Sequence, residues 1–343
     1  MIYPPKPRPG DRVAIVSPSN GSPERFPEVY ELGLRRLREE FALEPVEYPT
    51  TRVMGGSPAD RARDLHAAFA DPQITAVLAT IGGDDQITVL RHLDDQLLQA
   101  NPKPFFGYSD NTNVLDRLWQ LGIVGFHGGS VLVHLGRSGR AHPAHVDSLR
   151  AALFGSGWHR LAEPPDWGDE PNDWREPSLL EFEPPMWPHE GWHWVNADQV
   201  VQGRTWGGNL EIISWLLQAG FVQANAVYHD CVLYLETSEE MPSAVEVFRM
   251  LRNMGERGLL AQFSALVVAR AKSWERNRRN SPEQKVAYRR DQREAVLTAM
   301  RAYHPHAMIV FDVDFGHSDP QLIIPNGGDI RLDGPAGEIH VRY

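Results

Sequence analysis

Ser109 has the surroundings of a nucleophilic serine. It follows the apolar run 104–108, which is typical of a buried strand, and it precedes Asp110, Asn111 and Thr112, residue types that begin helices. A serine at such a strand-to-helix corner projects its hydroxyl above the sheet edge, where the first helical N–H groups can stabilise an anion. The glycine that usually ends the Gly-x-Ser-x-Gly pattern is replaced by Asn111. The segment therefore predicts either a nucleophile or an ordinary helix cap.

Two other residues have the right chemistry to activate this serine. Glu236 follows the apolar run 232–235 and His317 follows the run 308–315, so both stand at the carboxyl ends of predicted strands. A serine hydroxyl becomes a good nucleophile when an imidazole accepts its proton and a carboxylate steadies the imidazolium. Ser109, His317 and Glu236 together would supply these roles. Since the chain has 14 His and 45 Asp and Glu residues, solvent-facing turn residues are the alternative explanation.

The elements around Ser109 predict an α/β fold. Strands are expected at 12–18, 76–81 and 104–108, and helices at 23–41, 59–70 and 86–98. This alternation is typical of βαβ units that form a mainly parallel sheet with helices on both faces, and ligands bind such sheets at the carboxyl ends of the strands. The turn 82–85 lies at one of these ends. It lacks the third glycine of a dinucleotide motif and the Gly-Lys-Ser/Thr of a Walker motif, so we expect it to bring backbone N–H groups close to a ligand.

A segment rich in Trp, Pro and acidic residues interrupts the alternation between about 154 and 204, and strands and helices resume beyond it. We therefore expect three parts. Residues 1–155 form an amino-terminal α/β domain that carries the nucleophile, and residues 156–200 form an insert or linker. Residues 201–343 form a smaller carboxy-terminal α/β domain, rich in β-strands, that carries the glutamate and the histidine, and its tail at 321–343 predicts β-hairpins.

The composition excludes several classes of partner. The chain has 343 residues, 42% of them hydrophobic, and a formal net charge of -11, which argues against a nucleic-acid polymer or an anionic membrane surface. Its single cysteine, Cys231, excludes an internal disulfide. No stretch approaches the roughly 18 apolar residues of a membrane span, and the amino terminus lacks an apolar signal core, so we expect a cytoplasmic protein.

Five short motifs, taken in order, resemble the LD-carboxypeptidase family of serine peptidases along nearly the whole chain. They are Ile81-Gly82-Gly83-Asp84-Asp85, Gly107-Tyr108-Ser109-Asp110, Gly207-Gly208-Asn209-Leu210, Leu235-Glu236-Thr237 and Gly316-His317-Ser318. The resemblance implies a flavodoxin-like or amidotransferase-like amino-terminal domain, a homodimer, and no metal or cofactor. It implies Ser109 as nucleophile, His317 as general base and acid, Glu236 as the orienting carboxylate, and the backbone N–H groups of Gly83 and Asp110 as the oxyanion hole.

The family has two branches with different substrates. One branch removes the terminal D-alanine from cell-wall tetrapeptides, and the other is similar to the microcin C immunity peptidase, which cleaves an amide between an acidic amino acid and a nucleotide-like group. The Asp84-Asp85 turn, the segment 236–239 and the Trp-rich insert resemble the second branch. This resemblance implies that the insert stacks a purine, with Trp167 and Trp174 as candidates, whereas the alternative for each indole is a place in the core of the insert or in a dimer contact. Asn209 is expected at the substrate or as a plain helix cap.

The segment His189-Glu190-Gly191-Trp192-His193 fits the zinc-peptidase pattern His-Glu-x-x-His. That pattern needs a helix, so that both imidazoles share one face. Pro188 precedes the segment and Gly191 lies inside it, which disfavours a helix. A zinc peptidase is therefore the weakest of the three functions considered.

Overall fold

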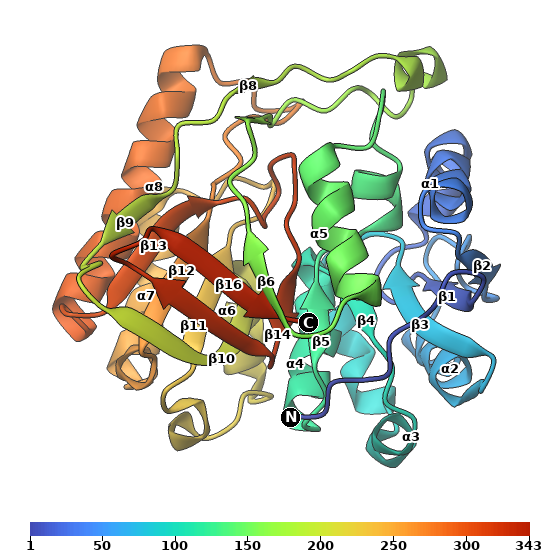
Figure 1. Cartoon of the computed structure of the whole chain (residues 1–343), viewed down its shortest axis with the longest axis horizontal. Helices are drawn as coiled ribbons and strands as arrows, with labels where there is room; N and C mark the ends of the chain where they lie inside the picture. Colours follow the sequence, from blue (N-terminus) through green and yellow to red (C-terminus); the bar gives the residue numbers. More distant parts are fainter.

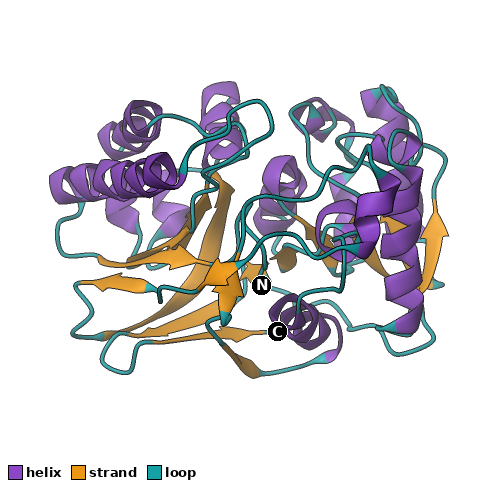
Figure 2. Cartoon of the chain, turned by 90° about the horizontal axis from the view of Figure 1, so that it is seen from above, coloured by secondary structure: helices purple, strands orange, loops and turns teal.

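Two β-sheets, each with helices packed against it, lie side by side (Figures 1 and 2). The computed structural model describes the whole chain, residues 1–343. The amino-terminal sheet, in blue and green apart from the red β14, lies on the right of Figure 1, and the carboxy-terminal sheet, in yellow to red apart from the green β6, lies on the left. The α/β fold expected from the sequence is confirmed.

The amino-terminal sheet has the strand order β14-β5-β4-β3-β1-β2, and only β14 is antiparallel to its neighbour. The strands are β1 (Arg12–Val16), β2 (Glu44–Glu47), β3 (Ile74–Ala79), β4 (Phe105–Gly107), β5 (Gly125–His127) and β14 (Ile324–Asn326). The helices are α1 (Pro27–Glu39), α2 (Pro58–Ala70), α3 (Asp95–Ala100), α4 (Thr112–Gln120) and α5 (Pro143–Phe154). Val13 and Ile15 of β1 pack with α1 and α5, whereas Ala14 and Val16 pack with α2, α3 and α4. Alternate residues thus bury both faces of this sheet, as parallel sheets require.

The carboxy-terminal sheet has the strand order β6-β16-β15-β10-β11-β12-β13-β9, with a parallel centre from β10 to β13 and antiparallel edges. Its strands are β6 (Trp158–Leu161), β9 (His193–Val195), β10 (Val200–Asn209), β11 (Val232–Glu236), β12 (Ala265–Ala269), β13 (Met308–Val313), β15 (Asp329–Asp333) and β16 (Glu338–Arg342). Its helices are α6 (Leu210–Ala219), α7 (Ala244–Glu256) and α8 (Pro282–Tyr303). No helix combines the length and the apolar character needed to cross a membrane. Strands β6 and β9, at the two edges, both come from the segment 156–200, which also forms the small pair β7 (Asp166–Trp167) and β8 (Trp187–Pro188).

The prediction of one helix at 86–98 is wrong. Residues 86–92 form two short 3-10 turns instead, and a regular helix starts only at α3. The Gln86 side chain bonds Asn111 and the backbone of Val114, so it ties this segment to α4. Leu93 is extended, and Asp94 caps α3 by accepting from the N–H of Leu97. Tertiary hydrogen bonds and a new cap therefore override the local apolar spacing.

The end of the chain joins the two sheets. After β13 it crosses back to place β14 beside β5, and then returns as β15 and β16. Asn326 of β14 donates from its side chain to the carbonyl of Leu115 in α4, at 2.9 Å. One large apolar cluster contains residues from both sheets, among them Phe126 and Ile324 of the amino-terminal sheet and Tyr234 of the carboxy-terminal sheet. The relative position of the sheets is therefore fixed by shared core packing.

We predict that Ile324→Ala lowers the free energy of unfolding by about 2–5 kcal/mol, because it leaves a cavity in the core that both sheets share. Urea unfolding measures the change. The matched control is Val286→Ala on the exposed face of α8, which should change it by less than about 0.5 kcal/mol. Equal effects of the two substitutions would contradict a core role for β14.

Candidate active site

Ser109 lies at a sharp corner between β4 and α4. Its φ is 60°, in the left-handed region that residues other than glycine rarely adopt, and a single 3-10 turn at 109–111 leads into the helix. A Cβ on Gly82 would lie 2.8 Å from the Cβ of Ser109, so only glycine fits against this corner. A strained backbone at a strand-to-helix corner is the conformation expected of a nucleophilic serine.

The structure brings Ser109, His317 and Glu236 together across the two sheets. The Nε2 of His317 lies 3.2 Å from the Oγ of Ser109, and the Nδ1 of His317 lies 2.5 Å from the Oε2 of Glu236. Ser109 stands at the carboxyl end of β4, Glu236 ends β11, and His317 follows β13. These contacts link nucleophile, base and carboxylate in the order that a serine hydrolase uses.

His317 lies between two carboxylates. Its Nε2 is also 3.0 Å from the Oε2 of Glu239, in the turn after β11. Burial by itself lowers the pKa of His317, but the charges of Glu236 and Glu239 outweigh burial and raise that pKa to about 10. In turn, and against the effect of its own desolvation, the charge of His317 lowers the pKa of Glu239 to about 2. The free enzyme therefore holds His317 as an imidazolium flanked by carboxylates.

The side chain of Asp110 holds the turn 82–86 next to Ser109. Its buried carboxylate accepts from the Ser19 hydroxyl and from the backbone N–H groups of Asp85 and Gln86, the latter two at 3.1 and 2.8 Å. Burial raises the pKa of Asp110 in spite of these bonds. Gly83 belongs to this turn and lines the same cavity as Ser109. This arrangement places the backbone of Gly83 near the nucleophile, where an oxyanion hole would need it.

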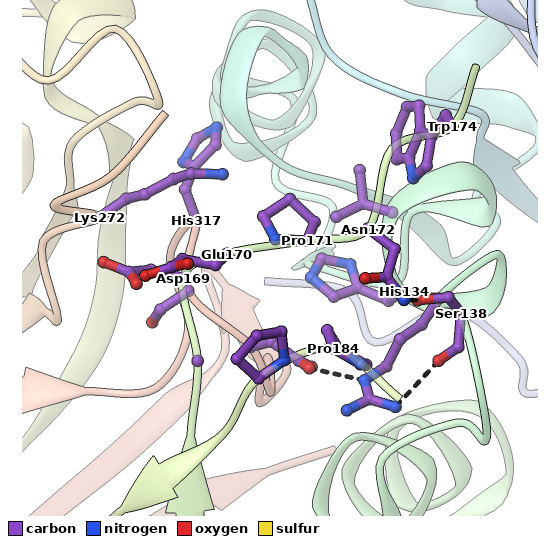
Figure 3. A pocket seen from close by; sticks show the side chains of 16 residues that line it. His134, Ser138, Asp169, Glu170, Pro171, Asn172, Trp174, Pro184, Lys272 and His317 are labelled. Atoms are coloured by element: carbon purple, nitrogen blue, oxygen red, sulfur yellow. Dashed lines mark hydrogen bonds and ion pairs between the residues drawn. The ribbon is translucent and has the colours of Figure 1, made fainter. Parts of the chain in front are cut away.

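A cavity of about 460 Å³ opens over Ser109 and His317. Its volume is in the range of small-molecule sites. A smaller adjoining cavity, drawn in Figure 3, shares Trp174, Lys272 and His317 with it. Figure 3 shows Lys272 and His317 on one side of this space and Trp174 on the other. His317 thus lies on the same side of this space as the cation of Lys272 and opposite the indole of Trp174.

The structure separates the two candidate tryptophans. Trp174 lines the cavity, and its ring packs edge-on against Phe26 at 5.3 Å. Trp167 is only 3% exposed, and the guanidinium groups of Arg270 and Arg289 lie 4.6 and 4.7 Å from its ring. These cation–π contacts occupy the indole, and Trp167 does not line the cavity.

Asn209 caps α6 and is buried. Its Oδ1 accepts from the N–H of Ile212 at 3.0 Å, and its own N–H donates to the Thr112 hydroxyl at 3.0 Å. The Cβ of any larger residue at Gly208 would meet the side chain of Thr112, so glycine lets β10 approach the start of α4. Asn209 pairs in register with Glu236, and its Nδ2 has no partner. It therefore lies on the strand next to Glu236 and does not line the cavity.

Comparison with known proteins agrees with this geometry. Residues 13–128 match the model of the LD-carboxypeptidase N-terminal domain, and residues 202–332 match that of the LD-carboxypeptidase C-terminal domain. The chain belongs to the LD-carboxypeptidase family of serine peptidases. It is therefore a hydrolase. The first matched region covers β1 to β5 of the amino-terminal sheet, and the second covers the parallel centre of the carboxy-terminal sheet together with β14 and β15.

Relatives in this family have different names. The chain is 27% identical to the Microcin C7 self-immunity protein MccF of Escherichia coli over 57% of each chain. It is 32% identical to the murein tetrapeptide carboxypeptidase of Pseudomonas aeruginosa, over 41% of this chain and 46% of that one. An MccF-like protein from Streptococcus pneumoniae, solved in complex with AMP, has the same fold with a TM-score of 0.85 and 24% identity, over 97% of this chain and 99% of that one.

Not every residue of the site in this LD-carboxypeptidase homologue could be predicted from the sequence. Glu239 and Lys272 both line the cavity, yet neither was predicted as a site residue. Lys272 opens the basic segment 272–279, and its side chain is buried and pairs with Glu275 at 3.6 Å. The signal available for Lys272 was its place just after the apolar run of β12, at the same sheet edge as Glu236.

The His-Glu-x-x-His segment is not helical. The side chain of His189 is only 4% exposed and its Nε2 lies 2.9 Å from Asp314, whereas His193 is exposed on the edge strand β9. The two imidazoles therefore lie in different surroundings and do not share the helix face that the zinc pattern needs. No group of three or more His, Cys, Asp or Glu side chains in the structure could hold a metal ion.

We predict that Ser109→Ala and His317→Ala each lower kcat at least about 1,000-fold without unfolding the protein, because each removes one member of the proton-transfer chain. Steady-state hydrolysis and circular dichroism measure activity and folding. Ser214→Ala on α6 and His229→Ala at an exposed position are the matched controls and should keep full activity. Near wild-type turnover by either triad variant would overturn the assignment.

We also predict that Glu239→Gln lowers the pKa of His317 in the free enzyme by about one pH unit or more, because it removes one of the two flanking negative charges. A ¹⁵N NMR titration of histidine-labelled protein measures this pKa, and the His317→Ala spectrum assigns the signal. Glu240→Gln, the control, removes a neighbouring charge with no contact to His317. Identical His317 titrations in wild type and Glu239→Gln would contradict the ion pair.

Proposed function

We propose that this protein hydrolyses the amide bond between an acidic amino acid and a nucleotide-like group, with Ser109, His317 and Glu236 as its triad. The observation that carries the proposal is the chain of contacts from Ser109 through His317 to Glu236 at the wall of a cavity that Trp174 and Lys272 also line. Serine, imidazole and carboxylate supply the chemistry of acyl transfer, and the cavity supplies room for a small molecule.

The reaction follows from these positions. His317 accepts the proton of Ser109 as the Oγ attacks the amide carbonyl, and the negative oxygen of the tetrahedral intermediate is held by the N–H groups of Gly83 and Asp110. His317 then gives its proton to the leaving nitrogen, and the acyl-enzyme forms. Water, activated by His317 in the same way, releases the acidic amino acid and restores Ser109.

Residues that line the cavity would recognise the substrate. The indole of Trp174 offers a flat surface for a base, and such stacking contributes about 1–3 kcal/mol. The ammonium of Lys272 offers a partner for the acidic side chain. The support from relatives is the similarity to a microcin self-immunity protein and the AMP bound by a neighbour of the same fold. Release of D-alanine from cell-wall tetrapeptides is the second candidate, since the match to the murein tetrapeptide carboxypeptidase has the higher identity, 32%, over a shorter region.

The deciding experiment compares two substrates, aspartyl sulfamoyl adenosine and an L-D-linked muropeptide tetrapeptide, with wild type and Ser109→Ala. We expect the wild type to cleave the adenosine compound and Ser109→Ala to cleave neither. We also expect Trp174→Ala to raise KM for the adenosine compound about 5- to 100-fold, while Trp158→Ala, at an exposed position on β6, leaves KM unchanged. Release of D-alanine alone would overturn the proposal in favour of the second candidate.

A further inference from the structure

The carboxylate of Glu239 contacts the ring nitrogen of His317 that the proposed reaction uses. It lies 3.0 Å from the Nε2 of His317, and that same nitrogen lies 3.2 Å from the Oγ of Ser109. In the catalytic cycle Nε2 must accept the proton of Ser109 and later give it to the leaving nitrogen. While Nε2 carries a proton shared with Glu239, it has no lone pair for Ser109. Glu239 therefore has to move before catalysis can begin.

The turn that carries Glu239 has a fixed base and an exposed tip. Its base is held by Glu211, which accepts from the backbone N–H and the hydroxyl of Ser238 at 3.0 and 2.7 Å. The side chain of Glu239 is 51% exposed, and His317 is its one ion-pair partner. By contrast, Glu236, three residues earlier, is fully buried on β11. Rotation of the Glu239 side chain alone would free Nε2 while the backbone of the turn stays in place.

The charges around the Glu239 carboxylate indicate which kind of ligand group could displace it from His317. Lys272 faces the same cavity but pairs with Glu275, and the cation that pairs with Glu239 is His317 itself. A carboxylate at this position repels an anionic group of a ligand and attracts a cationic one. In an aminoacyl substrate the α-amino nitrogen is attached to the carbon next to the carbonyl that Ser109 attacks. A free α-ammonium group thus arrives close to Glu239 when the carbonyl reaches Ser109.

We propose that Glu239 binds the free α-ammonium group of the substrate, and that this contact replaces its contact with His317. Building on the function proposed above, this assigns to the site a requirement for an unblocked amino-terminal residue. As Glu239 turns to the ammonium, the Nε2 proton of His317 passes to water, and Nε2 can then accept the proton of Ser109. Substrate binding and activation of the base are in this way coupled through one side chain.

The test compares aspartyl sulfamoyl adenosine with succinyl sulfamoyl adenosine, which has hydrogen in place of the α-amino group. We expect the wild type to show a kcat/KM about 10- to 100-fold lower on the succinyl compound, the value of one charged hydrogen bond. In Glu239→Gln and Glu239→Ala this ratio should fall toward one. In the matched control Glu240→Gln it should remain that of the wild type, because Glu240 does not contact His317.

A second measurement does not depend on turnover. Calorimetry gives the ratio of the dissociation constants of the two compounds for Ser109→Ala, and for the same variant with Glu239→Gln added, where the ratio should again fall toward one. The role of Glu239 alone would be overturned if substitution of Glu239 left the ratio unchanged, or if the wild type had the same kcat/KM for both compounds. Failure of the wild type to bind or cleave either adenosine compound would instead overturn the function on which this role rests.

Discussion

The catalytic geometry depends on how firmly the two sheets are held together, because Ser109 comes from one sheet and Glu236 and His317 come from the other. A displacement of about 1 Å between reacting groups can cost about 100-fold in rate, so the join has to be rigid. Buried hydrogen bonds across it meet that need. Trp206 of β10 donates to the carboxylate of Asp116 in α4 at 2.9 Å, and Trp119 of α4 donates to the carbonyl of Thr205 at 3.1 Å. Both hydrogen bonds tie α4, which starts just after Ser109, to β10.

The charge balance around His317 sets the second constraint. Two carboxylates beside one buried imidazole stabilise its charged form, which is the form that develops during attack by Ser109. The same two charges also stabilise that form before attack, when His317 has to be neutral. Glu236 cannot resolve the conflict because it is buried and bound to Nδ1. The exposed partner, Glu239, is the one that can leave, so the conflict is resolved by a side chain at the surface of the cavity.

The sequence located the groups that stand at strand ends. Ser109, Glu236 and His317 each follow an apolar run, and the topology of a parallel sheet puts such positions at one edge. The sequence failed where position depends on tertiary contacts. Trp167 and Trp174 have the same residue type in the same insert, and only the folded arrangement shows that two guanidinium groups cover the first.

The prediction of a helix at 86–98 failed for a related reason. Its apolar spacing was sufficient for a helix, but the hydrogen bonds of Gln86 to the segment after the nucleophile decide its backbone. Glu239 lies in a turn, where no periodicity marks a residue, and its contact with His317 joins positions 78 residues apart. Periodic patterns therefore predict the framework, whereas contacts between loops have no local signature in the sequence.

Chemistry and recognition occupy different parts of this fold. The triad stands on strand ends, but Trp174 and Lys272 stand on two loops that are tied to each other. Asp169 of the insert accepts from the hydroxyl of Ser273, next to Lys272, at 2.7 Å, and Arg276 lies 3.1 Å from Asp173, next to Trp174. Because these ties lie outside both sheets, the cavity wall can change its residues without moving the triad. In the function proposed above, the same strand-end groups can then serve different amides.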